Sequence, residues 1–563
     1  MKRLFLAWLG VWAIPFGVFG EEKKDQKPVN LNPSIPIDEV LEKQNKMKET
    51  EGYGNKPEQL EWLQDAGFGM FIHWNVDCQI GSVISHSLVG ASKEYSDWYF
   101  DELPKTFNPK RWDADEVARL AKLTGMKYVV FTAKHHSGFC WWDTPSTPFN
   151  ITKTPYEGDV LGDYCAALRK YGIKVGFYYS PEDFHWLYRN GYTVSRKQPD
   201  LPSTDKHPEY SKYIADQLTE LMKYEPDILF FDSFENEVAK RTAWEIDPDI
   251  LITRGAIATP EQHVPGMPPK GVWESNLTMG TQWNYKPTND DYKSGTRIIE
   301  ILIETRAKGG ACMMNIGPEP NGEIPQPQED RLREVALWHA VNKEAVHDVR
   351  PWVVAREENV WFTRSKDGKD LYVILTREED WKIGTERSFL LQSVKATEGT
   401  EISVLGHGGE VVEYQVDVDP TPSFEQEEGG LRIAVTRGQR LYNNYSWHNP
   451  VVAKLTNVEP AFEVPPFAET KDVVAKNTLS GELVELAGAE SVEVFFEYQV
   501  YKGFAAAMHN TEWEATPAQL VSEVGEFVAK VEGLELGETY QYRAVVKHPK
   551  ITMRGNHLRF VAE

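Results

Sequence analysis

The sequence predicts an α/β protein: a (β/α)8 TIM-like barrel, followed by a β-sandwich and then by a C-terminal fibronectin type III-like β-sandwich. In residues 57–348, short apolar runs alternate with helix-period segments, a pattern that indicates parallel strands buried on both faces. Seven or eight such units over about 290 residues fit a closed barrel better than an open doubly wound sheet. From residue 349 onward the apolar segments are short, β-rich and separated by turn residues, which is typical of sandwiches.

The N-terminus predicts export. Residues 1–20 begin with MKR, continue with an apolar run over 4–19, and give way to a charged stretch, as in a secretory signal peptide. A membrane-spanning helix is disfavoured because the run is short, contains Pro15 and lacks a basic stop-transfer flank. Residues 21–56 are polar and predict a linker. We therefore expect a secreted or periplasmic protein with no membrane span.

The barrel strands are predicted from apolar runs that punctuate residues 57–348. These runs are GFGMFIHW at 67–74, YVVFTAKH at 128–135, VGFYYS at 175–180, DILFFD at 227–232, ILITR at 250–254, VWE at 272–274 and ACMMNIG at 311–317. The helices between them are predicted at 113–123, 161–171, 210–224 and 295–308. No GxGxxG or Walker loop follows the first strand, which argues against a nucleotide-binding sheet.

Two β-rich units are expected after the barrel. Residues 349–456 contain runs such as VWFT at 360–363 and LYVIL at 371–375, with turn residues between them. Residues 457–563 form the second unit, in which LELGETYQYR at 534–543 is similar to the late-strand pattern of fibronectin type III domains.

Composition narrows the class of partner. The 563 residues include 61 Lys or Arg and 85 Asp or Glu, for a net charge of −24, which disfavours nucleic acids and anionic membrane surfaces. The chain has 18 Trp, 24 Tyr and 25 Phe, and such rings serve both protein interfaces and sugar sites. The 4 cysteines form no CxxC pair, so buried free thiols are expected.

Polar residues end the predicted strands, where a parallel barrel places its functional side chains. Such groups are costly to desolvate unless they pair or act, and their repetition over seven strands favours a site. They are His73, His135, His136, Tyr178, Asp232, Arg254, Glu274 and Asn315.

Two carboxylates in this set, Asp232 and Glu274, come from different strands, as glycoside hydrolysis requires. Asp232 follows apolar residues and is expected to have a cation, Arg254, nearby, an environment that suits an ionised nucleophile. A ring beside Glu274 would raise the proton affinity of its carboxyl group, which suits an acid. The alternatives are a helix cap at Asp232 and a surface salt bridge at Glu274. Glu235 and Glu237 are rival acids.

The pair His135–His136 does not predict a metal. Neighbouring residues on a strand point to opposite sides, and neither HExxH nor DxDxDG is present. Neutral imidazoles suit hydroxyl recognition, so no metal and no cofactor are expected. Several tryptophans near strand ends or in the following loops favour a carbohydrate cleft, although core packing is the alternative for any one of them. They are Trp74, Trp98, Trp141, Trp142, Trp273 and Trp283.

These motifs, in this order, resemble glycoside hydrolase family 29, the retaining α-L-fucosidases. The resemblance covers about residues 57–352 and includes GFGMFIHW at 67–74, KHHSGFC at 134–140, GFYYS at 176–180, FFD at 230–232, WE at 273–274 with QWNY at 282–285, and KGGACMMNIGP at 308–318. It implies Asp232 as the nucleophile and Glu274 as the acid/base. It also implies a fucose pocket formed by His73, Asp97, Trp98, His135, His136, Tyr178, Arg254 and Trp283.

Four positions depart from the family's usual pattern. Ser137 stands where Asp usually follows the two histidines, Asp97 where Glu usually precedes Trp-Tyr, Phe230 where Trp is often found, and Ala311 where Asn follows Gly-Gly. The resemblance therefore implies release of α-L-fucose, or of a modified fucose, from fucosylated oligosaccharides or polysaccharides. An exo-hydrolase for L-galactosides and a non-catalytic glycan-binding protein are the alternatives.

Overall fold

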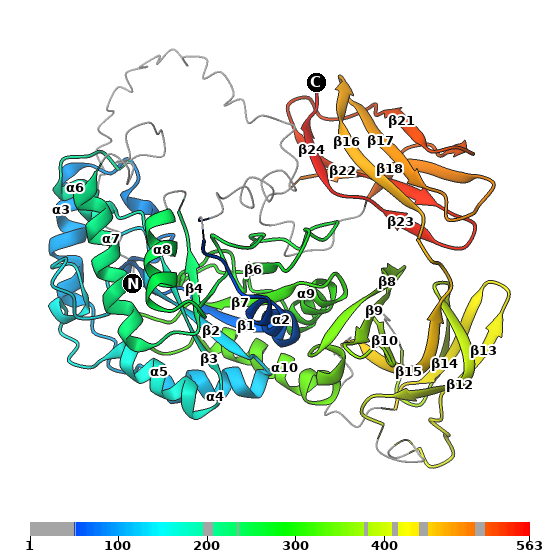
Figure 1. The fold of residues 1–563 in the computed structure, drawn as a ribbon, viewed down its shortest axis with the longest axis horizontal. Helices are drawn as coiled ribbons and strands as arrows, with labels where there is room; N and C mark the ends of the chain where they lie inside the picture. The colour runs from blue at the N-terminus through cyan, green and yellow to red at the C-terminus, as the bar shows by residue number, and fades with distance from the viewer. Residues whose placement is uncertain are drawn as a thin grey trace, which may run out of the picture. The chain divides into compact units, whose positions relative to one another are not determined.

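Figure 1 shows the fold of the chain in a computed structural model. The structure describes residues 50, 52–194, 207–233, 236–376, 381–407, 412, 415–438, 449–501 and 513–563. The predicted signal peptide and most of the predicted linker, residues 21–49 and 51, lie outside these residues. Within them, no helix is both long enough and apolar enough to cross a membrane.

Seven parallel strands form the sheet of the first region, in the order β5-β4-β3-β2-β1-β7-β6. Their bounds are β1 Phe68–Ile72, β2 Tyr128–Lys134, β3 Lys174–Tyr179, β4 Ile228–Phe231, β5 Leu251–Ile252, β6 Glu274–Thr278 and β7 Ala311–Ile316. Every residue of β1, β2, β4 and β7 is buried, as expected for strands covered on both faces. The strand order agrees with a (β/α)8 barrel and confirms the predicted α/β fold class.

An irregular segment lies along the open side of the sheet, between β5 and β6. Isolated parallel bridges join Ala258 to Trp273 and Glu261 to Asn276. The backbone N–H of Asn276 donates to the carbonyl of Pro260, and that of Gln262 donates back to Asn276. Residues 258–262 therefore run parallel to β6 and take the place of a strand at the barrel wall.

Helices flank this sheet (Figure 1). They are α2 Pro57–Ala66, α3 Lys93–Asp101, α4 Ala114–Thr124, α5 Val160–Lys170, α6 Phe184–Arg189, α7 Pro208–Leu221, α8 Glu237–Ile246, α9 Gly295–Ala307 and α10 Gln326–Asn342. Short 3-10 turns include η1 Val76–Ile80 and η2 His86–Leu88, which follow β1. Helix α4 illustrates the local signals: Asp113 caps its N-terminus by accepting from the Glu116 N–H at 3.0 Å, and Gly125 ends it at φ 89°.

The barrel has two apolar layers. Side chains inside the sheet, including Phe71, Tyr178 and Phe230, form one cluster, and a larger cluster packs the outer face of the sheet against the helices. Four of the tryptophans considered as sugar walls belong to the barrel core, with exposed fractions of 0–2 % for Trp74, Trp141, Trp142 and Trp273. The expectation that they line a cleft is therefore wrong. All four cysteines are buried free thiols, as predicted.

The rest of the chain is antiparallel β-structure. One five-stranded sheet has the order β12-β15-β10-β9-β8, and a three-stranded sheet has the order β11-β14-β13. Their bounds are β8 Val349–Glu357, β9 Val360–Ser365, β10 Asp370–Leu375, β11 Glu386–Leu391, β12 Val394–Val404, β13 Ser423–Glu427, β14 Gly430–Thr436 and β15 Val451–Pro460. The apolar cluster of this region draws on both sheets, as in a sandwich.

The last region has its own pair of sheets, β16-β17-β21 and one built on β18 and β22. Its strands are β16 Phe467–Ala475, β17 Thr478–Glu485, β18 Val492–Val500, β19 Glu514–Ala515, β20 Gln519–Val521, β21 Gly525–Lys530, β22 Thr539–Lys547, β23 Thr552–Arg554 and β24 Leu558–Val561. A separate apolar cluster joins these two sheets. The exact domain boundaries stay predictions.

Candidate active site

A cavity of about 60 Å³ opens among the carboxyl ends of the barrel strands. Seven of the sequence-predicted site residues line it: His73, His135, His136, Tyr178, Asp232, Arg254 and Trp283. They converge because parallel strands all end at the same rim. His73 directly follows β1, His135 directly follows β2, and Asp232 directly follows β4. Each apolar strand thus places a polar residue at one edge of the sheet.

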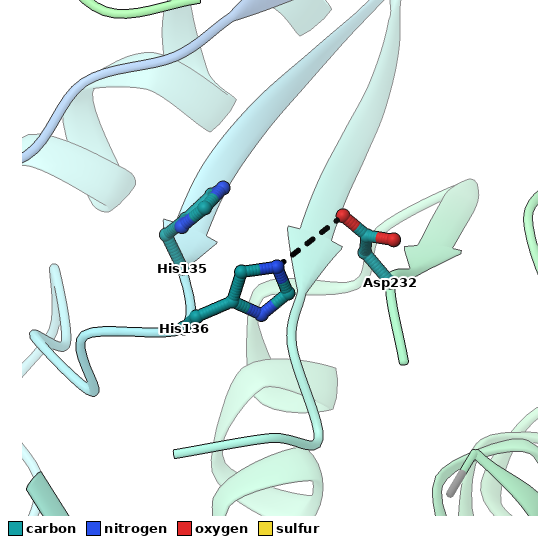
Figure 2. A group of neighbouring side chains, drawn as sticks. All are labelled: His135, His136 and Asp232. Atoms are coloured by element: carbon teal, nitrogen blue, oxygen red, sulfur yellow. Dashed lines mark ion pairs between the residues drawn. The ribbon is translucent and has the colours of Figure 1, made fainter. Parts of the chain in front are cut away.

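Asp232 is held by two donors. Arg254 Nη1 donates to Oδ1 at 2.8 Å, and the Tyr178 hydroxyl donates to Oδ2 at 2.9 Å. Burial alone would raise the pKa of Asp232, but the Arg254 and His136 charges and these hydrogen bonds hold it well below its usual range. Figure 2 shows the His136 ring turned toward this carboxylate, with Nε2 at 3.7 Å from Oδ2. Asp232 is therefore an ionised carboxylate that remains 29 % exposed to the cavity.

Two of the pocket histidines, His73 and His135, are oriented by hydrogen bonds to residues that do not line the cavity. His73 Nδ1 donates to Asn315 Oδ1 at 2.7 Å, which leaves Nε2 as the acceptor of the neutral ring. His135 Nδ1 lies 2.8 Å from Ser85 Oγ. Burial lowers the pKa of His73 to about 3 and that of His135 well below its ordinary value. Both rings are thus neutral at pH 7 and able to bind hydroxyl groups.

A second carboxylate of the cavity is Glu261, which sequence reasoning missed. Arg254 Nη1 lies 3.2 Å and Nη2 3.1 Å from Glu261 Oε2, so one guanidinium contacts both Glu261 and Asp232. The side chain of Glu261 is 38 % exposed. Its segment, residues 258–262, lacks the apolar run that is typical of the other strands, so the sequence pattern predicts no strand there.

Glu274 does not reach this cavity, and the expectation that it ends a strand is wrong. It is the first residue of β6, in register with Ala311, the first residue of β7. Its side chain is fully buried and accepts a hydrogen bond at 2.5 Å from Tyr128, the first residue of β2. Burial raises the pKa of Glu274 to about 7. The carboxyl group therefore lies at the amino ends of the strands, opposite the rim that carries Asp232.

Asp97 and Trp98 are also not brought to the cavity. Both lie on α3, where Asp97 pairs with Lys93 at 2.5 Å and accepts from the Tyr188 hydroxyl at 2.7 Å. Trp98 is 39 % exposed and packs beside Tyr95. Sequence adjacency to a family motif does not fix which side of a helix faces the rim.

The alternative acids predicted from the sequence were Glu235 and Glu237, and the structure describes only Glu237. Glu237 begins α8 and pairs with Lys240 at 2.6 Å, outside the cavity lining. Glu235 lies outside the described residues.

The remaining lining residues were not predicted as site residues. They are Phe71, Ile84, His86, Phe230, Glu261 and Asn276. Of the four departures from the family pattern, only Phe230 lines the cavity. Ser137 is buried and accepts from the Asn75 amide at 2.8 Å, and Ala311 begins β7.

One group of side chains in the described residues could hold a metal ion: His135, His136 and Asp232, whose ligand atoms lie within 4.8 Å of one another (Figure 2). Arg254 would compete with a metal ion at this position, because its guanidinium already forms an ion pair with one Asp232 oxygen. The expectation of metal-free chemistry stays a prediction.

A parallel barrel whose rim holds two carboxylates on one arginine, neutral histidines and an indole is typical of a glycoside hydrolase. The family model of alpha-L-fucosidase matches residues 37–344. The chain belongs to the alpha-L-fucosidase family, and it is a glycoside hydrolase that releases α-L-fucose.

Relatives support this assignment over most of their own length. The chain is 27 % identical over 404 residues to the plasma alpha-L-fucosidase of Rattus norvegicus, which covers 62 % of this chain and 83 % of the relative. It is 25 % identical over 419 residues to the alpha-L-fucosidase of Dictyostelium discoideum, covering 64 % and 86 %. Among solved structures, alpha-L-fucosidase isoenzyme 1 of Paenibacillus thiaminolyticus matches with a TM-score of 0.57 and 26 % identity, covering 71 % of this chain and 99 % of that one.

Proposed function

We propose that Asp232 is the nucleophile and Glu261 the general acid/base in a retaining release of α-L-fucose. The observation that carries this proposal is the shared guanidinium nitrogen, Arg254 Nη1, which lies 2.8 Å from one carboxylate and 3.2 Å from the other. The two oxygens are therefore no farther apart than these distances together. That spacing suits the ~5–5.5 Å carboxyl separation of a retaining pair.

The proposed chemistry assigns a separate role to each carboxyl group. Asp232 is ionised and attacks the anomeric carbon, while Glu261 gives its proton to the departing glycosidic oxygen. The aglycone leaves, and a fucosyl–Asp232 ester remains. Glu261 then takes a proton from an incoming water, whose oxygen attacks the anomeric carbon and releases fucose and free Asp232. The partial exposure of Glu261 suits a group that must meet both the aglycone and the water.

We assign Glu274 a structural role in place of the catalytic one expected from the sequence. Tyr128 binds one of its oxygens, and Oε1 has no hydrogen-bond partner among the described residues. With a pKa of about 7 and no exposure, it is a largely neutral carboxylic acid inside the barrel below pH 7.

The test compares aryl α-L-fucosides whose leaving groups differ in acidity. We expect Glu261→Ala to lose about 10²–10⁴-fold in kcat/KM with a poor leaving group and much less with dinitrophenolate, which needs no protonation. Azide should rescue Glu261→Ala to give the α-fucosyl azide, because two displacements retain configuration. Rescue of Asp232→Ala should give the inverted β-azide from one displacement. The matched variant Glu274→Ala should show no azide rescue.

The proposal fails if Glu261→Ala keeps full activity on poor leaving groups, or if Glu274→Ala gives the α-azide. Treatment with 2-fluoro-fucosyl fluoride provides a further check. The fluorosugar should be found on the peptide that contains Asp232, and a label on any other carboxylate contradicts the nucleophile assignment.

We also propose that the enzyme is exported and acts on fucosylated oligosaccharides or polysaccharides. The basic start and apolar run over residues 4–19 support export, and N-terminal sequencing of the secreted protein should begin after Gly20. Specificity for fucose rather than L-galactose is tested by paired aryl glycosides, which differ by one hydroxyl at C6. A higher kcat/KM for the L-galactoside than for the fucoside would favour the L-galactoside alternative.

A further inference from the structure

We propose that Asp77 is a positioning residue that holds two walls of the sugar pocket in place before the sugar binds. The inference deepens the proposed function, because it rests on the use of this pocket for fucose. Asp77 lies in the 3-10 turn η1, the next element after β1, and does not line the cavity.

Three donors from three separate segments converge on the Asp77 carboxylate. Its Oδ2 accepts from the Ser85 backbone N–H at 2.7 Å and from the Tyr99 hydroxyl at 2.9 Å. Its Oδ1 accepts from Asn284 Nδ2 at 2.9 Å. The carboxyl group is fully buried, so each of these bonds forms where water does not compete. This one buried carboxyl group thus ties together η1, the loop before η2, helix α3 and the loop after β6.

Two of these three segments carry pocket residues. Ser85 stands between Ile84 and His86, which both line the cavity. Asn284 directly follows Trp283, whose ring also lines it and lies 4.6 Å from the His73 ring. The hydrogen bonds of Asp77 therefore link two segments that contribute to the pocket wall.

The connection through Ser85 extends to a pocket histidine. Ser85 is held at φ 61°, a left-handed conformation that costs free energy in a residue with a side chain and needs support from its surroundings. Its Oγ accepts from the Ser137 N–H at 2.9 Å and lies 2.8 Å from His135 Nδ1. When the Ser85 hydroxyl donates a hydrogen bond to Nδ1, the neutral His135 ring carries its own proton on Nε2. Asp77 thus acts on the orientation of His135 through Ser85.

The third donor provides a matched control. Tyr99 donates to the same oxygen as the Ser85 N–H, but it comes from α3 and does not line the cavity. Tyr99→Phe removes one hydrogen bond from Asp77 without touching the pocket wall. Asp77→Ala removes the acceptor from all three segments. Asp77→Asn keeps one carbonyl oxygen for Ser85 and Tyr99, and Asn284, whose Oδ1 has no partner among the described residues, can turn to accept from the new amide.

The experiment measures the Kd of deoxyfuconojirimycin by calorimetry and KM and kcat with an aryl α-L-fucoside. We expect Asp77→Ala to raise Kd and KM by about tenfold or more and to lower kcat by a smaller factor, because binding contacts are lost in both the ground and transition states. Asp77→Asn should return both constants to within about threefold of the wild type. Tyr99→Phe should leave them unchanged while it lowers Tm.

The proposal is overturned if Asp77→Ala lowers Tm but leaves Kd and KM unchanged. If Asp77→Ala does not fold, two further variants test the contacts separately: Asn284→Ala removes the donor to Asp77 Oδ1, and Ser85→Ala keeps the backbone N–H that binds Asp77 but removes the hydroxyl that contacts His135. Each should raise Kd by several-fold, and an unchanged Kd in both also overturns the proposal. Because Kd is measured without turnover, a failure of the catalytic assignment is distinguishable. In that case Asp232→Ala would keep activity, whatever the Asp77 variants do.

Discussion

The substitution Glu274→Gln is expected to stabilise the protein, relative to the wild type, more at pH 8 than at pH 4. Burial raises the pKa of Glu274 from its ordinary value of 4.5 to about 7, so the folded protein holds a proton that the unfolded chain releases. The stability that depends on this proton is fully present below pH 4.5 and is lost as the pH rises to about 7. At about 1.4 kcal/mol for each pH unit, the loss is ~3 kcal/mol.

Glutamine reproduces the protonated carboxyl group at every pH. Its carbonyl can still accept from Tyr128, and its amide takes the position of the unpartnered Oε1. The free energy of unfolding of Glu274→Gln should therefore rise by ~3 kcal/mol relative to the wild type between pH 4 and pH 8. Denaturant unfolding at both pH values measures this difference, and Glu58→Gln, an exposed substitution of the same kind, is the control.

The same variant tests catalysis. Because Glu274 lies away from the cavity, Glu274→Gln should keep kcat/KM within about threefold of the wild type at neutral pH. Two results would refute the reasoning. One is a difference in stability that does not change between pH 4 and pH 8. The other is a loss of about 10²-fold or more in activity from a protein of unchanged stability.

Three further predictions concern other parts of the barrel. Arg254→Lys removes the forked guanidinium that contacts both Asp232 and Glu261, so the pKa of Asp232 should rise. The acid limb of the pH profile of kcat/KM should then move to higher pH by about one unit or more. An unmoved limb contradicts the role of Arg254 in keeping Asp232 ionised. Trp98→Ala, on α3, should leave KM for a small aryl fucoside within about twofold, and a large rise in KM would place Trp98 in the pocket. Asp183→Ala leaves Lys134 without its 3.0 Å partner in the core, so it should lower the free energy of unfolding by about 3–5 kcal/mol, and a loss below about 1 kcal/mol would mean that the pair is not buried in solution.

Much of the site was predictable because a parallel barrel converts sequence position into spatial position. An apolar run that ends in His73, Asp232 or Arg254 has its last side chains at one rim, whatever the helices between the runs contain. The same logic placed His135, beyond the last residue of β2. Local pattern was sufficient for these residues because each follows a largely apolar run.

The prediction failed where the apolar run was not the strand. The apolar pattern predicts a strand that ends at Glu274, but β6 begins at Glu274 and runs through Ser275 and Asn276 to Thr278. Those polar residues are buried inside the barrel wall, and a pattern of apolar residues cannot reveal them. The error moved a carboxyl group from one end of the barrel to the other.

The residue pattern alone predicts the barrel, the polar residues at one rim, Asp232 with Arg254 near it, and the resemblance to the fucosidases. It does not predict which second carboxylate lies near Asp232 or which tryptophans belong to the core. The physical reason is that Glu261 lies on an irregular segment held by isolated bridges, and Asp77 acts through donors 8, 22 and 207 residues away in the chain. Such contacts exist only once the loops at the rim have closed over the strands.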